Sequence, residues 1–286
     1  MSFINIFSMN KVILGIVITL IVSILLNFDM NVEANTKKCS QNPYVTTDII
    51  QSQKLSSLNT ETGSNSEMVG IAPSERENDK YQSMTQLEDE TTEGVDWKKS
   101  IRNTGKEILI VAPHGGNIEQ GTTELTKALA DKGNYDYFSF EAIRPKNNSE
   151  LHVTSRNYND LMLNSMIQNR KATISIHGAK GNEKIVYIGG PRSDLRNEIE
   201  KELVSRGFNV MVPPDNLSGK DDENFINREK GNTGIQLELT YALRKSFFTN
   251  NDVRTKNRSY QYNWTHEMYE FLDALYNSIH NIYPNT

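Results

Sequence analysis

Cysteine is nearly absent from this chain, since Cys39 is the single one among 286 residues. An internal disulfide needs two thiols, and a structural zinc site built on thiolates needs several, so the sequence excludes both. Histidine is also scarce, with five in the whole chain. A site that depends on imidazole groups therefore has few possible members.

The chain also lacks an excess of positive charge. Lys and Arg total 31 against 36 Asp and Glu, which gives a formal net charge of -5 at pH 7. Without a basic field over the whole protein, the sequence argues against nucleic acid and against an anionic membrane surface as partners. An anionic ligand would have to be bound by a local group of arginines.

Apolar residues are few as well, at 36% of the chain, and the mean hydropathy is -0.58. Much of the polar excess lies in residues 35–79, a segment rich in Ser, Thr, Asn, Gln and Glu without sustained periodicity, which predicts a disordered linker. The folded domain is then expected at residues 80–286, a length that suits one good-sized domain.

One long apolar run does occur, VILGIVITLIVSILLNF at residues 12–28, directly after Lys11. A cation followed by an apolar run is typical of a secretory signal, and VEA at residues 32–34 resembles a cleavage site. The alternative is an uncleaved anchor, because about 18–20 apolar residues span a bilayer. Residues 1–34 are thus predicted to be a signal peptide or membrane anchor. The protein is expected to be secreted or held outside the cytoplasm, with this segment as its only membrane contact.

From residue 81 onwards, compact β-branched runs alternate with stretches whose apolar residues lie three or four positions apart. The alternation predicts a single layered α/β domain, with a mostly parallel or mixed twisted sheet flanked by helices. The expected strands are 107–113, 135–143, 172–178, 184–190, 208–214 and 234–240. The expected helices are 122–133, 158–169, 193–207 and 260–283, the last docked by side chains that include Tyr262 and Trp264.

In such sheets the functional site lies at the carboxyl ends of the strands. His114, His177 and Glu238 lie at the ends of the first, third and sixth expected strands. Since the carboxyl ends of parallel strands meet at one edge of a sheet, these three side chains are candidates for a common site.

The stretch VAPHGGNIEQG around His114 adds a second carboxylate. Glu119 follows His114 by five positions, which on a helix would leave the two side chains on different sides. Gly115 and Gly116 permit a sharp turn instead, and such a turn folds Glu119 back beside the imidazole. Two histidines, one glutamate and an open position describe catalytic zinc, so His114, Glu119 and His177 are predicted to bind Zn²⁺.

The same residues also permit an interpretation without a metal. A histidine after a strand is often a hydrogen-bonded turn residue, and glycine pairs usually mark turns. His266 and His280 lie on the expected C-terminal helix, where they are interpreted as surface or packing groups. The sequence does not decide between these interpretations for His152 in LHVTS.

Glu238 lies in GIQLELT, where it shares one face of the strand with Gln236 and Thr240. A carboxylate inside an apolar strand costs free energy unless it is paired or solvated. One interpretation is an ion pair with Arg228 or Arg244. The other is a general base that accepts a proton from the water molecule at the metal.

Several stretches of this sequence, in the order in which they occur, resemble the poly-γ-glutamate hydrolases of phages and bacilli. The matching pieces are distributed along residues 81–244 and are EGVDW, VAPHGGNIEQGTTELTKALA, YFSFEAI, LHVTS, ISIHGAKG and NFINREKGNTGIQLELTYALR. The resemblance implies a carboxypeptidase-like α/β fold, a zinc site, and a peptidase that hydrolyses the γ-glutamyl amide bonds of poly-γ-glutamate. It supports His114, Glu119 and His177 as ligands, with Glu238 as the counterpart of the general base in zinc carboxypeptidases.

The implied substrate carries a free α-carboxylate on every residue, and arginine binds carboxylates bidentately. Among the loop arginines, Arg156 and Arg228 lie nearest the matching blocks and are expected to bind the polymer, with His152 beside them. In zinc carboxypeptidases the arginines that hold the substrate precede the second histidine, whereas Arg228 follows His177.

Two other functions fit the same residues. One is a different zinc amidase or carboxypeptidase that acts on small acidic amides, and the other is a non-catalytic relative that only binds a polyanion. The joint presence of all four candidate residues argues against the second, because an inactive copy need not retain them. In each case the protein is expected to act as a monomer.

Overall fold

The computed structural model describes residues 79–228 and 234–286. The predicted signal or anchor segment at residues 1–34 and all but the last residue of the predicted linker therefore lie outside the described residues. Among the helices in the described ranges, none is both long and apolar enough to cross a membrane.

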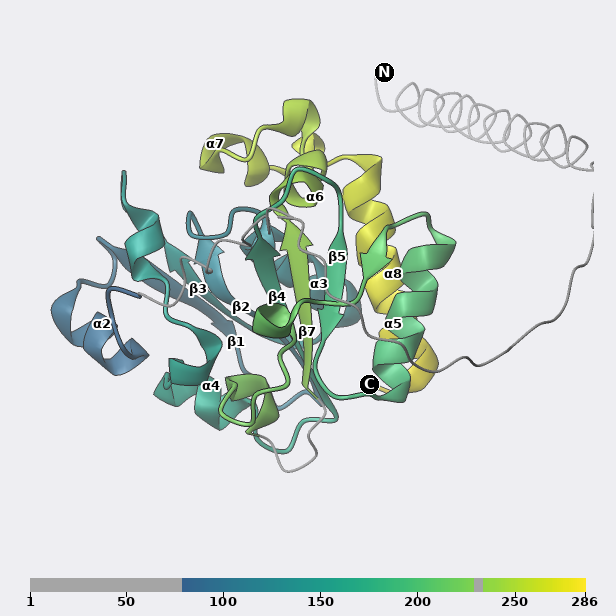
Figure 1. The fold of residues 1–286 in the computed structure, drawn as a ribbon, viewed down its shortest axis with the longest axis horizontal. Coiled ribbons are helices and arrows are strands. Elements are labelled where there is room, and N and C mark those ends of the chain that lie inside the picture. Colours follow the sequence, from purple (N-terminus) through teal and green to yellow (C-terminus); the bar gives the residue numbers. More distant parts are fainter. Residues whose placement is uncertain (1–78, 229–233) are drawn as a thin grey trace, which may run out of the picture. The chain divides into compact units, whose positions relative to one another are not determined.

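The described residues form a seven-stranded sheet in the order β1-β3-β2-β4-β7-β5-β6 (Figure 1). Neighbouring strands are parallel except in the pairs β1–β3 and β5–β7. The predicted α/β fold with a mixed, mostly parallel sheet is thus confirmed. The strands are β1 (Trp97–Arg102), β2 (Ile108–Gly116), β3 (Asp136–Ala142), β4 (Ala172–Ala179), β5 (Val186–Gly189), β6 (Val210–Met211) and β7 (Gly234–Thr240).

Helices cover both faces of this sheet. The helices are α2 (Met84–Glu90), α3 (Thr122–Gly133), α4 (Leu161–Met166), α5 (Asp194–Ser205), α6 (Tyr241–Ser246), α7 (Thr255–Arg258) and α8 (His266–Ile282). Short 3-10 turns connect them at η2 (Asn148–Leu151), η3 (Ser155–Asn157), η4 (Asp215–Leu217), η5 (Phe225–Asn227), η6 (Thr249–Asn251) and η7 (Gln261–Asn263).

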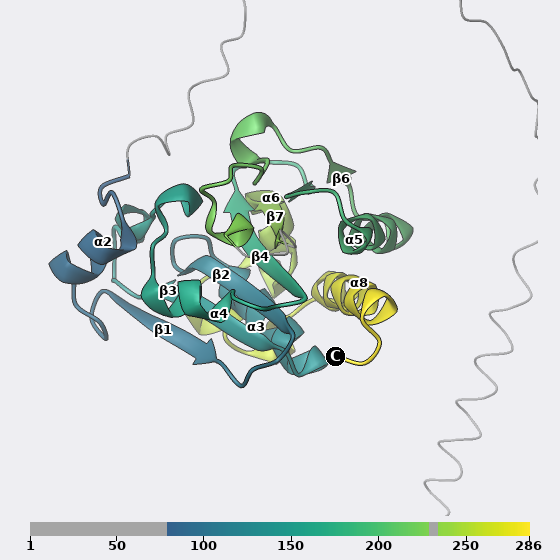
Figure 2. The same ribbon diagram turned by 90° about the horizontal axis from the view of Figure 1, so that it is seen from below.

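The sequence of strand β2 is apolar throughout, without alternating polar residues, because both faces of the strand are buried. Ile108 and Ile110 join one buried cluster with side chains of α3, α5 and α8. Leu109 and Val111, which point the other way, join a second cluster with side chains of α2 and α4. A strand buried on both faces reads as a continuous apolar run. Helices α5 and α8 lie side by side over the first cluster (Figure 2).

Three parts of the predicted secondary structure need correction. The strand expected at residues 208–214 is reduced to Val210–Met211, since Pro213 and Pro214 lack the N–H that a sheet ladder needs. The C-terminal helix begins at His266, not at residue 260, because the side chain of Thr265 caps it by accepting the N–H of Met268. Tyr262 therefore lies before the helix, and it is 79% exposed instead of docked. Helix α2 and strand β1 were not predicted, because both are short and present a partly exposed face.

Candidate metal centre

Three neighbouring strands bring the predicted side chains together. Strands β2, β4 and β7 are adjacent and parallel, and His177 pairs directly with Glu238 in the β4–β7 register. His114, His177 and Glu238 are all buried. The carboxyl ends of these strands therefore place two imidazoles and a carboxylate at one point of the sheet edge, as the sequence predicted.

The turn after His114 follows the expected course. The register of β2 on β3 shifts between Ala112 and Gly115, and Gly116 has a φ of 64°. A Cβ atom on Gly115 would lie 2.2 Å from Thr123 Oγ1, and one on Gly116 would lie 2.4 Å from a backbone carbonyl oxygen. Both positions thus require glycine. The N–H of Glu119 donates to the carbonyl of His114 at 3.0 Å, which closes the turn.

This turn folds Glu119 back to the two histidines. One ligand atom from each of His114, Glu119 and His177 lies within 4.8 Å of the others. The Nδ1 atoms of His114 and His177 are 3.2 Å apart, and Glu119 Oε1 lies 3.5 Å from His114 Nδ1. Ligands at about 2.0–2.1 Å from a tetrahedral zinc ion are about 3.3–3.4 Å from one another. The distances from His114 Nδ1 to His177 Nδ1 and to Glu119 Oε1 are close to this value, so both pairs could share a zinc ion.

Contacts on the far side of each candidate ligand hold it in place. His114 Nε2 donates to the carbonyl oxygen of Val153 at 2.9 Å, so the neutral ring carries its proton there and turns the Nδ1 lone pair toward the centre. Ser175 Oγ lies 2.7 Å from His177 Nε2. Glu119 Oε2 accepts the N–H of Gly178 at 2.6 Å. Outer contacts of this kind orient metal ligands and set the histidine tautomer.

The centre opens into a cavity of about 380 Å³, lined in part by His114, His177 and Glu238. Glu238 is held at this cavity by a chain of amides. The side chain of Asn224 donates to Gln236 Oε1 at 2.9 Å, and Gln236 Nε2 donates to Glu238 Oε1 at 3.0 Å. Glu238 Oε1 is thus held by a side-chain amide that is itself anchored by Asn224.

His152 also lines this cavity, as the sequence analysis expected. Its ring centroid lies 4.0 Å from that of His114. Burial and the neighbouring His114 lower the pKa of His152 below its usual value, against the opposing effect of Asp79, which contacts His152 Nδ1 at 2.7 Å. Asp79 was missed, because it lies at the end of the predicted linker and no motif marks it.

The two predicted arginines are placed differently. Arg156 lines the cavity, with a 57% exposed side chain that pairs with Asp221. Arg228 is not among the residues that line the cavity, and its guanidinium donates to the carbonyl oxygens of Tyr158 and Arg156, each at 2.8 Å. The structure thus brings Arg156 to the site, whereas Arg228 holds the segment that carries Arg156.

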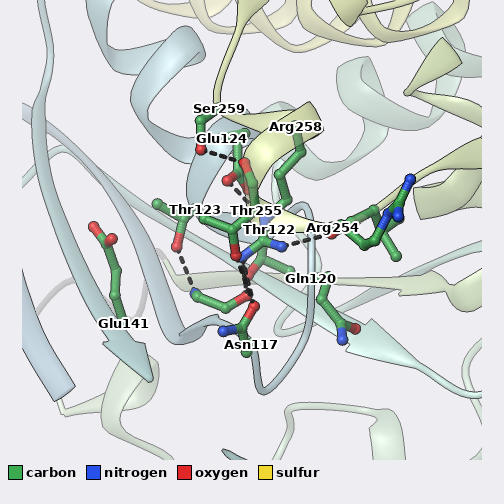
Figure 3. A network of polar contacts seen from close by, with 12 residues as sticks. Asn117, Gln120, Thr122, Thr123, Glu124, Glu141, Arg254, Thr255, Arg258 and Ser259 are labelled. Carbon is green, nitrogen blue, oxygen red and sulfur yellow. Dashed lines mark hydrogen bonds and ion pairs between the residues drawn. The ribbon is translucent and has the colours of Figure 1, made fainter. Parts of the chain in front are cut away.

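A buried arginine that the sequence analysis missed supports the glycine turn from behind. Arg258 of α7 is 2% exposed, and its Nη2 donates to the carbonyl of Gly116 and to Asn117 Oδ1, each at 2.9 Å (Figure 3). Its Nε donates to Glu124 Oε1 of α3 at 2.8 Å. One guanidinium therefore ties α7 and α3 to the loop between His114 and Glu119.

Replacing Arg258 with methionine is expected to lower the free energy of unfolding by about 3–5 kcal/mol, because the change leaves Glu124 as a buried charge without its partner. Urea denaturation of the full chain measures the loss. Arg254→Met is the matched control, since Arg254 lies on the same segment with a 68% exposed side chain. Equal denaturation midpoints for the two variants would contradict the structural role of Arg258.

Comparisons with known proteins relate this chain to one family. A sequence model of the family described as poly-gamma-glutamate hydrolase matches residues 81–274. UPF0714 protein YmaC of Bacillus subtilis (strain 168) is 32% identical over 173 residues, which is 60% of this chain and 71% of that protein.

Two solved structures have a similar fold. The structure of a bacteriophage poly-gamma-glutamate hydrolase aligns with a TM-score of 0.69 at 31% identity, over 73% of this chain and 100% of that one. The zinc-free, apo form of YndL aligns with a TM-score of 0.66 at 27% identity, over 72% of this chain and 100% of that one.

Proposed function

This chain belongs to the poly-γ-glutamate hydrolase family, and we propose that it hydrolyses the γ-glutamyl amide bonds of poly-γ-glutamate in a zinc-dependent reaction. The observation that carries the proposal is the convergence of His114, Glu119 and His177 at the edge of a cavity that His114, His177 and Glu238 line. The zinc-free form of the relative YndL supports zinc as the metal.

His114, Glu119 and His177 would hold the ion, through two imidazole nitrogens and one carboxylate oxygen. Zinc bound there supplies a Lewis acid that acidifies a water molecule and polarises the scissile carbonyl. The glycine turn and the contacts with Val153 and Gly178 keep the ligands in position before substrate arrives.

Glu238 acts as the general base in this proposal. Its carboxylate accepts the proton of the attacking water and returns that proton to the amine nitrogen that leaves. The hydrogen bond from Gln236 keeps the carboxylate at the cavity, so no reorientation is required between the two transfers.

His152 and Arg156 bind the substrate. The Asp79 carboxylate accepts the Nδ1–H of His152, so that Nε2 of the neutral ring is an acceptor for a substrate N–H. The Arg156 guanidinium, which is largely exposed at the cavity, presents donors that match an α-carboxylate.

We also propose that the protein is a monomer, and that it is secreted or anchored outside the cytoplasm through residues 1–34. Mass spectrometry of the N-terminus after expression in a secreting host distinguishes cleavage from anchoring.

The full chain is expected to lower the viscosity of a poly-γ-glutamate solution, to lose this activity with a chelator, and to regain it when Zn²⁺ is added. Metal analysis of the purified protein should give about one zinc per chain, because one ligand set is present in the described residues.

Two comparisons separate this function from its alternatives. Cleavage of short γ-glutamyl peptides with no loss of polymer viscosity would identify an amidase for small acidic amides. Binding of the polymer without any chain shortening, at full zinc content, would identify a non-catalytic binding protein.

A further inference from the structure

A second cation reaches the cavity beside Arg156. Lys220 lies between β6 and β7, lines the cavity and is exposed. Within residues 79–228 and 234–286, its ammonium group makes no hydrogen bond or ion pair, whereas Arg156 and Asp221 at the same cavity pair with each other. An exposed lysine on an anion-processing cavity offers a charge for the substrate.

The backbone on both sides of Lys220 is fixed. The side-chain amide of Asn227 donates to the carbonyl oxygens of Gly219 and Asp221, each at 2.8 Å. These two residues flank Lys220, so one amide holds the chain on either side of it. The lysine is therefore presented to the cavity from a defined position.

Asp221 lies next to Lys220 in the sequence and forms the ion pair with Arg156. Its other carboxylate oxygen, Oδ1, accepts the N–H of Glu223 at 2.9 Å. The backbone hydrogen bond from Glu223 and the Arg156 guanidinium keep the pKa of Asp221 below its usual value, so this carboxylate is ionised at neutral pH. Arg156 thus already holds a carboxylate of the protein itself.

The side chains of Arg156 and Asp221 are 57% and 36% exposed, respectively. Ion pairs in such exposed positions contribute little to stability, because water screens them. A carboxylate from a ligand can therefore replace Asp221 on Arg156 at small cost, and it would gain Lys220 as a second cationic partner.

We propose that Arg156 and Lys220 together form a recognition site for an α-carboxylate of the polymer, and that Asp221 occupies Arg156 until the polymer displaces it. This inference rests on the proposed function, since it names the substrate group that the same cavity recognises. It makes Lys220 and Asp221 determinants of substrate affinity, with no part in the chemical step.

Steady-state hydrolysis of poly-γ-glutamate by full-chain variants tests the proposal. Lys220→Gln is expected to raise KM by about 2- to 5-fold with kcat nearly unchanged, as loss of one exposed charge contact predicts. Lys146→Gln is the matched control, because Lys146 is exposed and does not line the cavity. A KM for Lys220→Gln equal to that of Lys146→Gln would overturn the role of Lys220.

Asp221→Asn is expected to lower KM by about 2- to 5-fold, because asparagine retains the oxygen that accepts the Glu223 N–H and gives up the charge that competes for Arg156. In an Arg156→Gln background the same change should have no effect on KM, since the contested cation is gone. An unchanged or raised KM for Asp221→Asn alone would overturn the displacement of Asp221.

These outcomes are separate from failure of the proposed function. If the parent chain with zinc does not shorten the polymer, the proposed function fails. If the parent is active and the variants at positions 220 and 221 behave like Lys146→Gln, only the carboxylate site fails. Thermal melting of each variant confirms that its fold is intact.

Discussion

Replacing either His114 or His177 with alanine is expected to remove both the bound zinc and the hydrolysis of poly-γ-glutamate. Each histidine supplies one of the three candidate ligand atoms that lie within 4.8 Å of one another. Loss of an outer contact to a ligand already weakens metal binding by about 10- to 100-fold, so loss of the ligand itself should exceed that. Metal analysis after dialysis and a viscosity assay measure the two losses.

His266→Ala is the matched control for this pair of variants. The imidazole of His266 lies at the start of α8 and is 87% exposed, so its removal should leave zinc content and activity unchanged. If His177→Ala kept one zinc per chain, His177 would be excluded from the ligand set. The same result for His114→Ala would exclude His114.

Glu238→Gln is expected to keep the zinc and to slow hydrolysis by about 10²- to 10⁴-fold, the usual effect of losing a general base. The amide is nearly isosteric with the carboxylate, and its oxygen can still accept the hydrogen bond from Gln236. The glutamine side chain at position 238, however, cannot accept the proton of the attacking water. Steady-state kcat at saturating polymer, together with metal analysis, measures the effect.

Glu119→Gln gives the contrast, because it makes the same substitution at a predicted ligand. Its amide loses the negative charge beside His114, so zinc binding is expected to weaken. If Glu238→Gln lost the metal and Glu119→Gln retained it, the two roles would have to be exchanged. If Glu238→Gln were fully active, the base would be sought elsewhere in the cavity, with His152 as the next candidate.

The prediction from sequence succeeded where the signal was local. The helix expected at residues 122–133 has those bounds, and Ser193 caps α5 as its position predicted. The approach of Glu119 to His114 was predictable because Glu119 follows His114 by only five positions, and the two glycines between them permit a sharp turn. The carboxyl-end rule of α/β sheets then indicated which strands would supply the remaining groups.

Contacts between distant parts of the chain were decided by the tertiary structure. Asp79 and His152 are 73 positions apart, and Arg258 is 142 positions from the Gly116 carbonyl that it binds. Neither pairing could be predicted from the sequence. Hydrophobic periodicity indicates on which side of its own helix or strand a residue lies, but it does not indicate which other element packs against that side. The tertiary structure also decided that Arg156 lines the cavity, whereas Arg228 binds backbone carbonyl oxygens of the segment that carries Arg156.

The sequence by itself therefore determined the α/β class, the glycine turn and the candidate ligands His114, Glu119 and His177, since each depends on short-range geometry or on the common edge of parallel strands. Only the tertiary structure decided that β4 and β7 are neighbours, which sets Glu238 in register with His177. It also decided that Lys220 faces the same cavity. Strand order and loop placement depend on how the apolar faces of all the elements pack together, and no single segment encodes that outcome.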